Sequence, residues 1–152
     1  MNIIVTDDDE GVTEVVKRYL HCHPVAGHAE ITICHTMKET QEIMESGKRV
    51  YAIFLDLCLA KDVPPLTGME TIAMIPELKK KGCEHVFAIS GYEQFRQASL
   101  AAGADEFLFK LGDMDTPKTF LEKVAKFFRE ARGPSPLEKQ VNHLQKMIDP
   151  PQ

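Results

Sequence analysis

Hydrophobic positions along this chain alternate between two spacings. Short apolar runs recur, and between them apolar residues fall three or four positions apart, which is the helical spacing. The runs predict strands at residues 2–6, 30–34, 51–57, 85–89 and 106–109. The segments between and after them predict helices at residues 10–20, 37–46, 69–81, 93–102 and 117–131. Regular alternation of strands with helices predicts an α/β fold, a doubly wound five-stranded parallel sheet with five flanking helices.

Residues 132–152 do not continue this alternation of strands and helices. Gly and Pro at 133–136 end the last helix, and a second apolar stripe follows at spacings of 4, 3 and 4, comprising Leu137, Val141, Leu144 and Ile148. We therefore predict a domain over residues 1–131 and, over 132–152, a linker with an extra C-terminal amphipathic helix. That helix either folds back onto its own domain or serves as a docking or dimerising helix, which would give a homodimer.

Composition narrows the range of partners. The chain has 18 Lys and Arg against 23 Asp and Glu, and its basic residues form no long run, so we expect no direct nucleic-acid binding. No apolar stretch is long enough to cross a membrane, and the N-terminus resembles no signal peptide. Four cysteines without CxxC spacing predict reduced thiols and a cytoplasmic location.

Acidic residues follow two of the predicted strands. Asp7, Asp8 and Asp9 come directly after the first strand, and Asp56 lies in the apolar run of the third. Because parallel strands place their carboxyl ends at one edge of the sheet, these side chains are expected to meet there. Clustered carboxylates need a cation or a shared proton, and oxygen ligands favour Mg²⁺. The pattern therefore predicts a magnesium site suited to phosphoryl chemistry.

Two further polar residues occupy the same edge of the predicted sheet. Ser90 follows the fourth strand and Lys110 the fifth. Together with the acidic residues, in this order, they resemble the receiver domain of two-component response regulators over roughly residues 1–131. The resemblance implies the flavodoxin-like strand order 2-1-3-4-5.

The resemblance also implies a role for each residue of the acidic cluster. Asp56 corresponds to the phosphoacceptor. Asp7 and Asp8 correspond to the acidic pair that holds Mg²⁺, with Asp56 and the main-chain carbonyl of Cys58 as further ligands. The implied cofactor is Mg²⁺.

Three other positions correspond to the switch of that family. Lys110 pairs with the phosphoryl group, Ser90 donates a hydrogen bond to it, and Phe107 is the aromatic residue that rotates inward. The implied function is to accept a phosphoryl group from a histidine kinase or a phosphotransfer protein and to signal to a protein partner. We therefore expect a signalling module rather than an enzyme, acting by protein contact or as a piece of a longer regulator that carries an output domain.

The sequence departs from the family pattern in two loops. Ala60 stands where the family usually has proline, and the loop after the third strand is several residues longer than usual. Leu111 follows Lys110 where proline is usual, so the fifth loop is expected to run differently.

Two other interpretations stay open at this point. The altered loops suggest a pseudo-receiver that keeps the fold and signals without phosphate. Asp7 and Asp9, followed by Gly11, also resemble the aspartate motif of haloacid-dehalogenase-type phosphohydrolases. That second interpretation leaves Asp56 unexplained.

Overall fold

The computed structural model describes residues 1–132, 143–144 and 147, with the side chains of residues 129–132 excepted. The helix predicted at residues 137–148 falls, apart from residues 143–144 and 147, outside the described part of the chain. Its role as a tail, docking or dimerising helix therefore stays a prediction.

In the described part of the chain, strands and α-helices alternate as the hydrophobic pattern predicts. The strands are β1 (Asn2–Thr6), β2 (Glu30–Cys34), β3 (Ala52–Asp56), β4 (His85–Ser90) and β5 (Glu106–Phe109). The α-helices are α1 (Glu10–His21), α2 (Met37–Glu45), α3 (Gly68–Lys80), α4 (Arg96–Ala101) and α5 (Pro117–Arg132). Two single 3₁₀ turns, η1 (Ala26–His28) and η2 (Glu93–Phe95), complete the order, so the helix predicted at 93–102 begins as a 3₁₀ turn.

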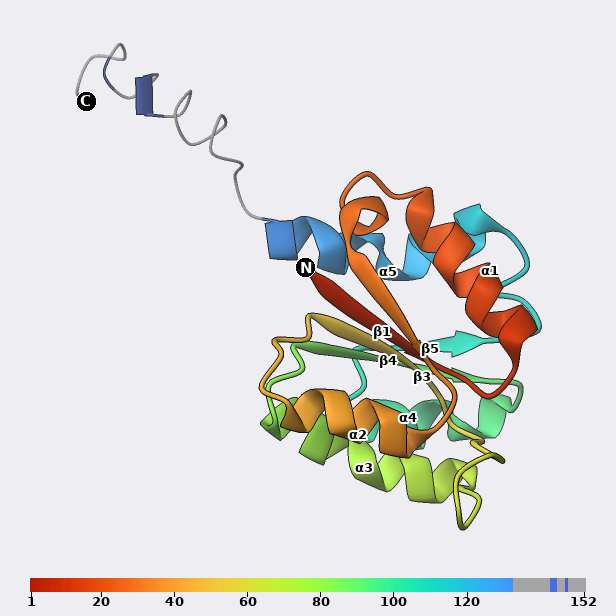
Figure 1. Ribbon diagram of the computed structural model, residues 1–152. Coiled ribbons are helices and arrows are strands. Elements are labelled where there is room, and N and C mark those ends of the chain that lie inside the picture. Colours follow the sequence, from red (N-terminus) through yellow and green to blue (C-terminus); the bar gives the residue numbers. More distant parts are fainter. Residues whose placement is uncertain (133–142, 145–146, 148–152) are drawn as a thin grey trace.

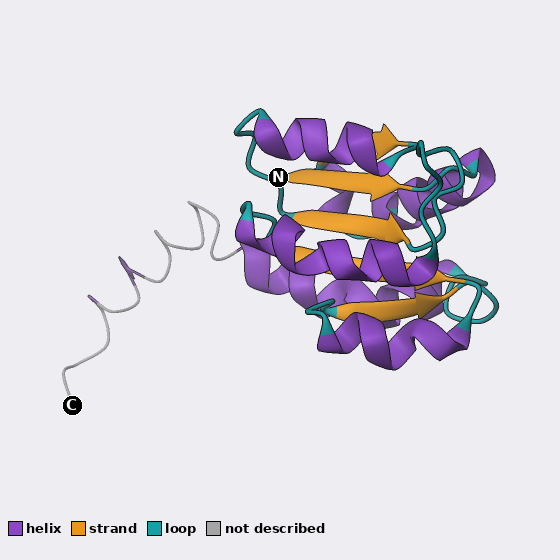
Figure 2. Cartoon of the chain, turned by 90° about the horizontal axis from the view of Figure 1, so that it is seen from below, coloured by secondary structure: helices purple, strands orange, loops and turns teal. Residues whose placement is uncertain are grey.

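The five strands form one parallel sheet in the order β2-β1-β3-β4-β5, which confirms the predicted fold class and strand order. Helices α1 and α5 cover one face of the sheet, and α2, α3 and α4 cover the other (Figure 1). The strands all point the same way, so their carboxyl ends share one edge (Figure 2). In such sheets that edge is where ligands bind.

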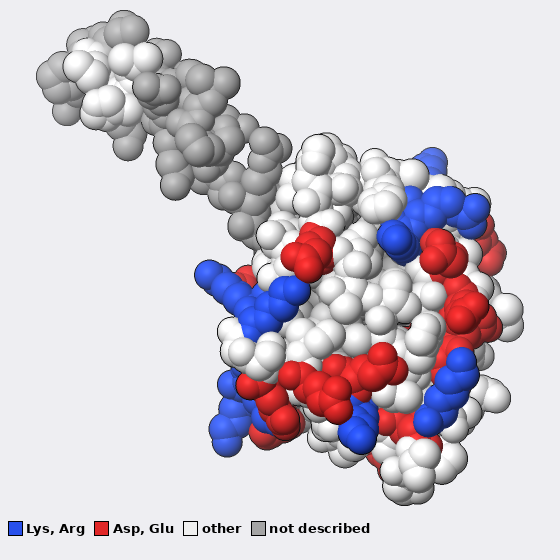
Figure 3. Space-filling view, viewed as in Figure 1, with Lys and Arg blue, Asp and Glu red and all other residues white. Residues whose placement is uncertain are grey.

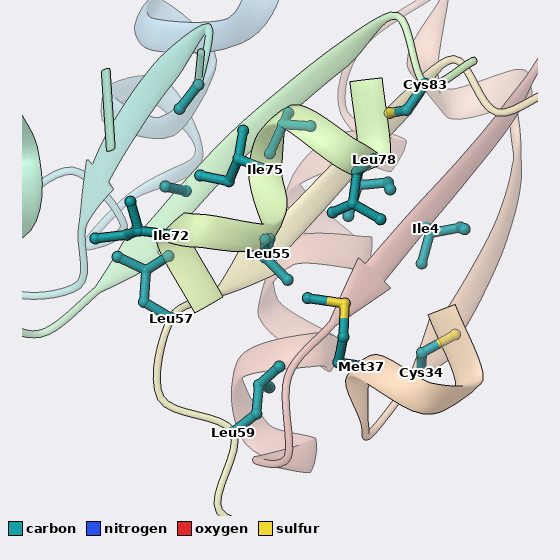
Figure 4. Close-up of a cluster of buried hydrophobic side chains, with 14 of the residues drawn as sticks. Ile4, Cys34, Met37, Leu55, Leu57, Leu59, Ile72, Ile75, Leu78 and Cys83 are labelled. Atoms are coloured by element: carbon teal, nitrogen blue, oxygen red, sulfur yellow. The ribbon is translucent and has the colours of Figure 1, made fainter. Parts of the chain in front are cut away.

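Strand β3 lies in the middle of the sheet, and all five of its residues are buried. Leu55 belongs to the apolar cluster under α2 and α3 (Figure 4), whereas Phe54 belongs to the cluster on the opposite face. The ring of Phe54 lies 4.8 Å from that of Phe87 and 5.5 Å from that of Phe120, between centroids. Burying each such side chain contributes about 1.5–3 kcal/mol. Packing on both faces therefore fixes the position of Asp56 at the end of the strand.

The first turn of α2 is capped by the side chains of Thr36 and Glu39. The Thr36 hydroxyl accepts a hydrogen bond from the Glu39 N–H at 3.1 Å. The Glu39 carboxylate accepts from the Thr36 hydroxyl and from the His35 N–H. This satisfies the third N–H of the helix, and the first two need another acceptor.

Lys and Arg side chains lie among Asp and Glu on the face shown in Figure 3. None of the helices in the described residues has both the length and the apolar character required to cross a lipid bilayer. All four cysteines are free thiols, as predicted, with Cys34 and Cys83 buried.

Candidate phosphoacceptor and metal site

The structure brings the predicted site residues together at the carboxyl edge of the sheet. Asp7 follows β1, Asp56 ends β3, Ser90 ends β4 and Lys110 follows β5. An open cavity of about 420 Å³ lies over these strand ends, lined by Asp8, Asp9, Asp56, Cys58, Ser90, Gly91, Tyr92, Lys110 and Leu111. Residues more than 100 positions apart in the chain thus share one site.

Three carboxylates meet in this site at different depths. Asp7 is fully buried, Asp56 is 3% exposed and Asp8 is half-buried. One oxygen from each lies within 4.8 Å of the others. Among the described residues, Asp7 Oδ2 has no hydrogen-bond partner.

Lys110 supplies the positive charge of the site. Its Nζ lies 3.4 Å from Asp56 Oδ1 and 3.5 Å from Asp7 Oδ2. Burial alone would lower the pKa of Lys110, but the charges of Asp56 and Asp7 together raise it, so the ammonium form is favoured. One cation therefore faces a cluster that includes two deeply buried carboxylates.

Burial and mutual repulsion make the acidic pair hard to ionise. Burial, and secondly the charge of Asp7, raise the pKa of Asp56 to about 7, although Lys110 offsets part of the effect. Burial also raises the pKa of Asp7, against the opposing effects of the Asp9 N–H and Lys110. The folded protein therefore retains a proton between these carboxylates to a higher pH than an exposed pair would.

The donor set fits a magnesium ion. Mg²⁺ prefers oxygen ligands, usually one or two carboxylates with several waters. Asp7, Asp8 and Asp56 each offer one oxygen to a common position, and Asp8 and Asp56 line the open cavity. Asp7 Oδ2 faces Lys110 Nζ at 3.5 Å but accepts no hydrogen bond among the described residues, so a divalent ion or its water would satisfy it. Cys58, whose carbonyl is the fourth predicted ligand, lines the same cavity.

Asp9 has a structural role in the described chain. Its carboxylate accepts a hydrogen bond from the Gly11 N–H at 2.8 Å and caps α1. Its own N–H donates to Asp7 Oδ1 at 2.9 Å. Asp9 is therefore engaged at the helix terminus, and it orients Asp7 through its backbone.

Ser90 lies beside Lys110 through the pairing of β4 with β5. The Lys110 N–H donates to the Ser90 carbonyl at 2.9 Å, and the Tyr92 N–H donates to Ser90 Oγ at 3.0 Å. Because Ser90 Oγ already accepts a bond, its hydroxyl hydrogen is the group left to donate into the cavity.

Phe107 is fully buried. The guanidinium carbon of Arg96 lies over its ring, 4.8 Å from the centroid. Arg96 also pairs with Glu93 and lies 3.9 Å from Asp113. Sequence reasoning did not find Arg96, because its spacing from Phe107 follows no helical or strand repeat.

The fifth loop runs as an ordinary turn. The peptide bond between Lys110 and Leu111 is trans, and Leu111 is 79% exposed. The Asp113 N–H donates to the Phe109 carbonyl at 3.0 Å, and the Phe109 N–H donates to Asp113 Oδ2 at 2.9 Å. A side-chain acceptor therefore closes the turn after β5.

The long loop after β3 folds into a small hairpin. Leu59 and Leu66 exchange two backbone hydrogen bonds, both 3.0 Å long. At its start, the Ala60 N–H donates to Asp8 Oδ2 at 3.0 Å. Farther along, Asp62 accepts from the first two N–H groups of α2. The sequence showed that Ala60 departs from the family pattern, but it did not show that the Ala60 N–H donates to Asp8.

No protein-family model matches this chain, and no curated protein matches it. Solved structures do match. A CheY-like response regulator receiver domain protein from Methanospirillum hungatei is 23% identical, with 85% of this chain and 94% of that chain covered and a TM-score of 0.64. A response regulator from Burkholderia pseudomallei, solved with a phosphorylated aspartic acid and a calcium ion, is 18% identical, with coverages of 97% and 83% and a TM-score of 0.63.

A third match is the BeF₃-activated receiver domain of DrrB from Thermotoga maritima. It is 20% identical, with 84% of this chain and 97% of that chain covered and a TM-score of 0.62. The chain therefore has the fold of a response regulator receiver domain.

Proposed function

We propose that this chain is a phosphorylatable receiver module in which Asp56 accepts a phosphoryl group in a Mg²⁺-dependent reaction. The observation that carries the proposal is the position of Lys110, whose ammonium group lies within 3.5 Å of both Asp56 and Asp7. These three residues come from the carboxyl ends of β1, β3 and β5. A lysine that served only as a solvated surface residue would not need to lie beside two buried carboxylates.

The reaction is attack of one Asp56 carboxylate oxygen on phosphorus, with departure of the donor's leaving group. The product is an acyl phosphate. Asp56 must be ionised to attack, and Lys110 favours that form. When bound, Mg²⁺ supplies further positive charge for the phosphoryl oxygens, and Asp7, Asp8, Asp56 and the Cys58 carbonyl would hold it.

The product then changes the hydrogen bonding of the site. A phosphoryl group carries about −2 charge and three acceptor oxygens, toward which Ser90 can donate its hydroxyl hydrogen. The Ser90 carbonyl accepts from the Lys110 N–H after β5, and Ser90 Oγ accepts from the Tyr92 N–H in the loop after β4, so a movement of Ser90 would shift both segments. Phe107 and the surrounding surface of α4, β5 and α5 would present the change to a protein partner.

The phosphoryl donor in this proposal is a histidine kinase or a phosphotransfer protein. Two neighbours support the chemistry by analogy, since one carries a phosphorylated aspartic acid and another is activated by BeF₃. In this role the protein is a signalling module and not an enzyme with steady turnover. The capping role of Asp9 leaves the phosphohydrolase alternative without its second acid.

Intact mass spectrometry after incubation with phosphoramidate and Mg²⁺ tests the proposal. We expect one phosphoryl adduct that is labile in base and absent from the Asp56→Asn variant. Wild-type protein that forms no adduct would favour the pseudo-receiver. An adduct that survives in Asp56→Asn, or steady release of phosphate by that variant, would favour a phosphohydrolase.

A further inference from the structure

The loop between β3 and α3, residues 57–67, reaches the metal site at Cys58 and again at Ala60. The Ala60 N–H donates to Asp8 Oδ2 at 3.0 Å. The two residues lie 52 positions apart, and Ala60 itself is exposed. Its side chain therefore contributes little packing, and its backbone N–H is the group with a specific partner.

The same loop is anchored on α2 at a second point. Asp62 Oδ2 accepts from the Met37 N–H at 2.9 Å, and Asp62 Oδ1 accepts from the Lys38 N–H at 3.3 Å. These are the first two N–H groups of α2, which Thr36 leaves without a partner. The carboxylate also faces the positive end of the helix dipole.

A third set of contacts closes the base of the loop. Leu59 and Leu66 form the paired backbone bonds of the hairpin. Leu59 is fully buried in the same apolar cluster as Met37, and Figure 4 shows both side chains at one end of that cluster. The segment that carries Ala60 is therefore fixed on both sides of that residue.

We propose that residues 57–67 form a support for the metal site, in which the Ala60 N–H positions the Asp8 carboxylate and Asp62 holds the loop in place against α2. Ala60 and Asp62 are positioning residues, since neither is among the expected ligands. The inference rests on the proposed Mg²⁺ site and adds two residues that are specific to this chain's long loop.

The physical reason is orientation of a ligand that burial does not hold. Asp7 and Asp56 are packed inside the sheet edge, but Asp8 is half-buried and needs a partner to fix its carboxylate. A hydrogen bond to one carboxylate oxygen selects one orientation and leaves the other oxygen for the ion. Loss of such a supporting bond typically weakens metal binding by about 10- to 100-fold.

Ala60→Pro removes the donor. Proline has no N–H. The residue before a proline must be extended, and Leu59 already pairs as a strand residue. Ala60→Gly is the matched control, because it keeps the N–H and removes only an exposed methyl group.

Isothermal titration calorimetry with MgCl₂ measures the effect on the full chain. We expect Mg²⁺ binding to be weaker by about 10-fold in Ala60→Pro and unchanged in Ala60→Gly. Asp62→Ala is expected to weaken binding by a smaller factor, whereas Lys61→Ala, at the exposed neighbouring position, should not. Asp62→Ala also keeps the test decisive if the proline variant fails to fold.

Amide hydrogen exchange provides a readout that a purely structural loop would not give. In metal-free protein the Ala60 amide should exchange slowly, and Asp8→Ala should accelerate it while amides of β3 stay protected. Equal Mg²⁺ affinity in wild type, Ala60→Pro and Asp62→Ala would overturn the inference and leave phosphorylation at Asp56 intact. Wild-type protein that binds no Mg²⁺ would overturn both.

Discussion

Replacing Asp56 by Asn is expected to stabilise the metal-free protein near neutral pH. Burial and the charge of Asp7 raise the pKa of Asp56 to about 7 from its ordinary value of 3.8. The folded state therefore binds this proton more tightly than the unfolded state does. Asn keeps the shape of the side chain and has no proton to lose.

The sign and size of the effect follow from linkage. A raised carboxyl pKa stabilises the folded state fully below pH 3.8, and this contribution is lost as pH rises to about 7. Between these values the free energy of unfolding falls by about 1.4 kcal/mol per pH unit. The whole interval corresponds to about 4 kcal/mol, which is a large share of the stability of a domain of this size.

Urea denaturation followed by circular dichroism, without Mg²⁺, measures the difference. The free energy of unfolding of Asp56→Asn should exceed that of wild type by up to about 4 kcal/mol at about pH 8. This gap between the two proteins should shrink steadily toward about pH 4. Added Mg²⁺ should narrow the gap at high pH by stabilising the ionised wild-type site. Asp115→Asn, at an exposed position, is the matched control.

A gap that stays constant from about pH 4 to about pH 8 would refute the reasoning, because it would show that Asp56 titrates alike in the folded and unfolded states. A gap that widens toward acid would reverse the sign and point to a carboxylate held ionised by Lys110.

Three further changes test other parts of the structure. Lys110→Gln removes the ammonium group beside the two buried carboxylates, and phosphorylation by phosphoramidate should slow by on the order of 100-fold, measured by intact mass against time. Arg96→Met removes the cation over the Phe107 ring and should lower the free energy of unfolding by about 1 kcal/mol in urea. Gly68→Ala would place a Cβ 2.5 Å from the Phe95 ring, so the ring must move. Thermal unfolding should show a free energy of unfolding lower by about 1–3 kcal/mol.

Matched changes separate these effects from general damage. Lys110→Arg keeps the positive charge and should restore part of the phosphorylation rate that Lys110→Gln loses. Gly91→Ala adds a Cβ that would meet no atom within 4 Å, and it should leave thermal unfolding almost unchanged. A loss at Gly91 as large as that at Gly68 would contradict the role assigned to the close contact.

The sequence by itself determined the order of elements and the edge of the sheet that carries the site. Spacing of apolar residues is a local signal, so strands such as 30–34 and 106–109 could be placed to the residue. Alternation of strands with helices then limits the topology, because parallel strands need crossovers and crossovers have one hand. Polar residues after successive strands had to meet at one edge, as Asp7, Asp56 and Lys110 do.

Tertiary structure alone decided how those residues are supported. The bond from Ala60 to Asp8 spans 52 positions, and Asp62 caps a helix 25 positions before it. Neither contact follows a helical or strand repeat in the sequence, because each depends on how a loop lies across other elements. The pKa of Asp56 likewise depends on burial and on the charge of Asp7, which exist only after the strands pair. Local pattern therefore gave the scaffold, and packing of distant segments set the electrostatics of the site.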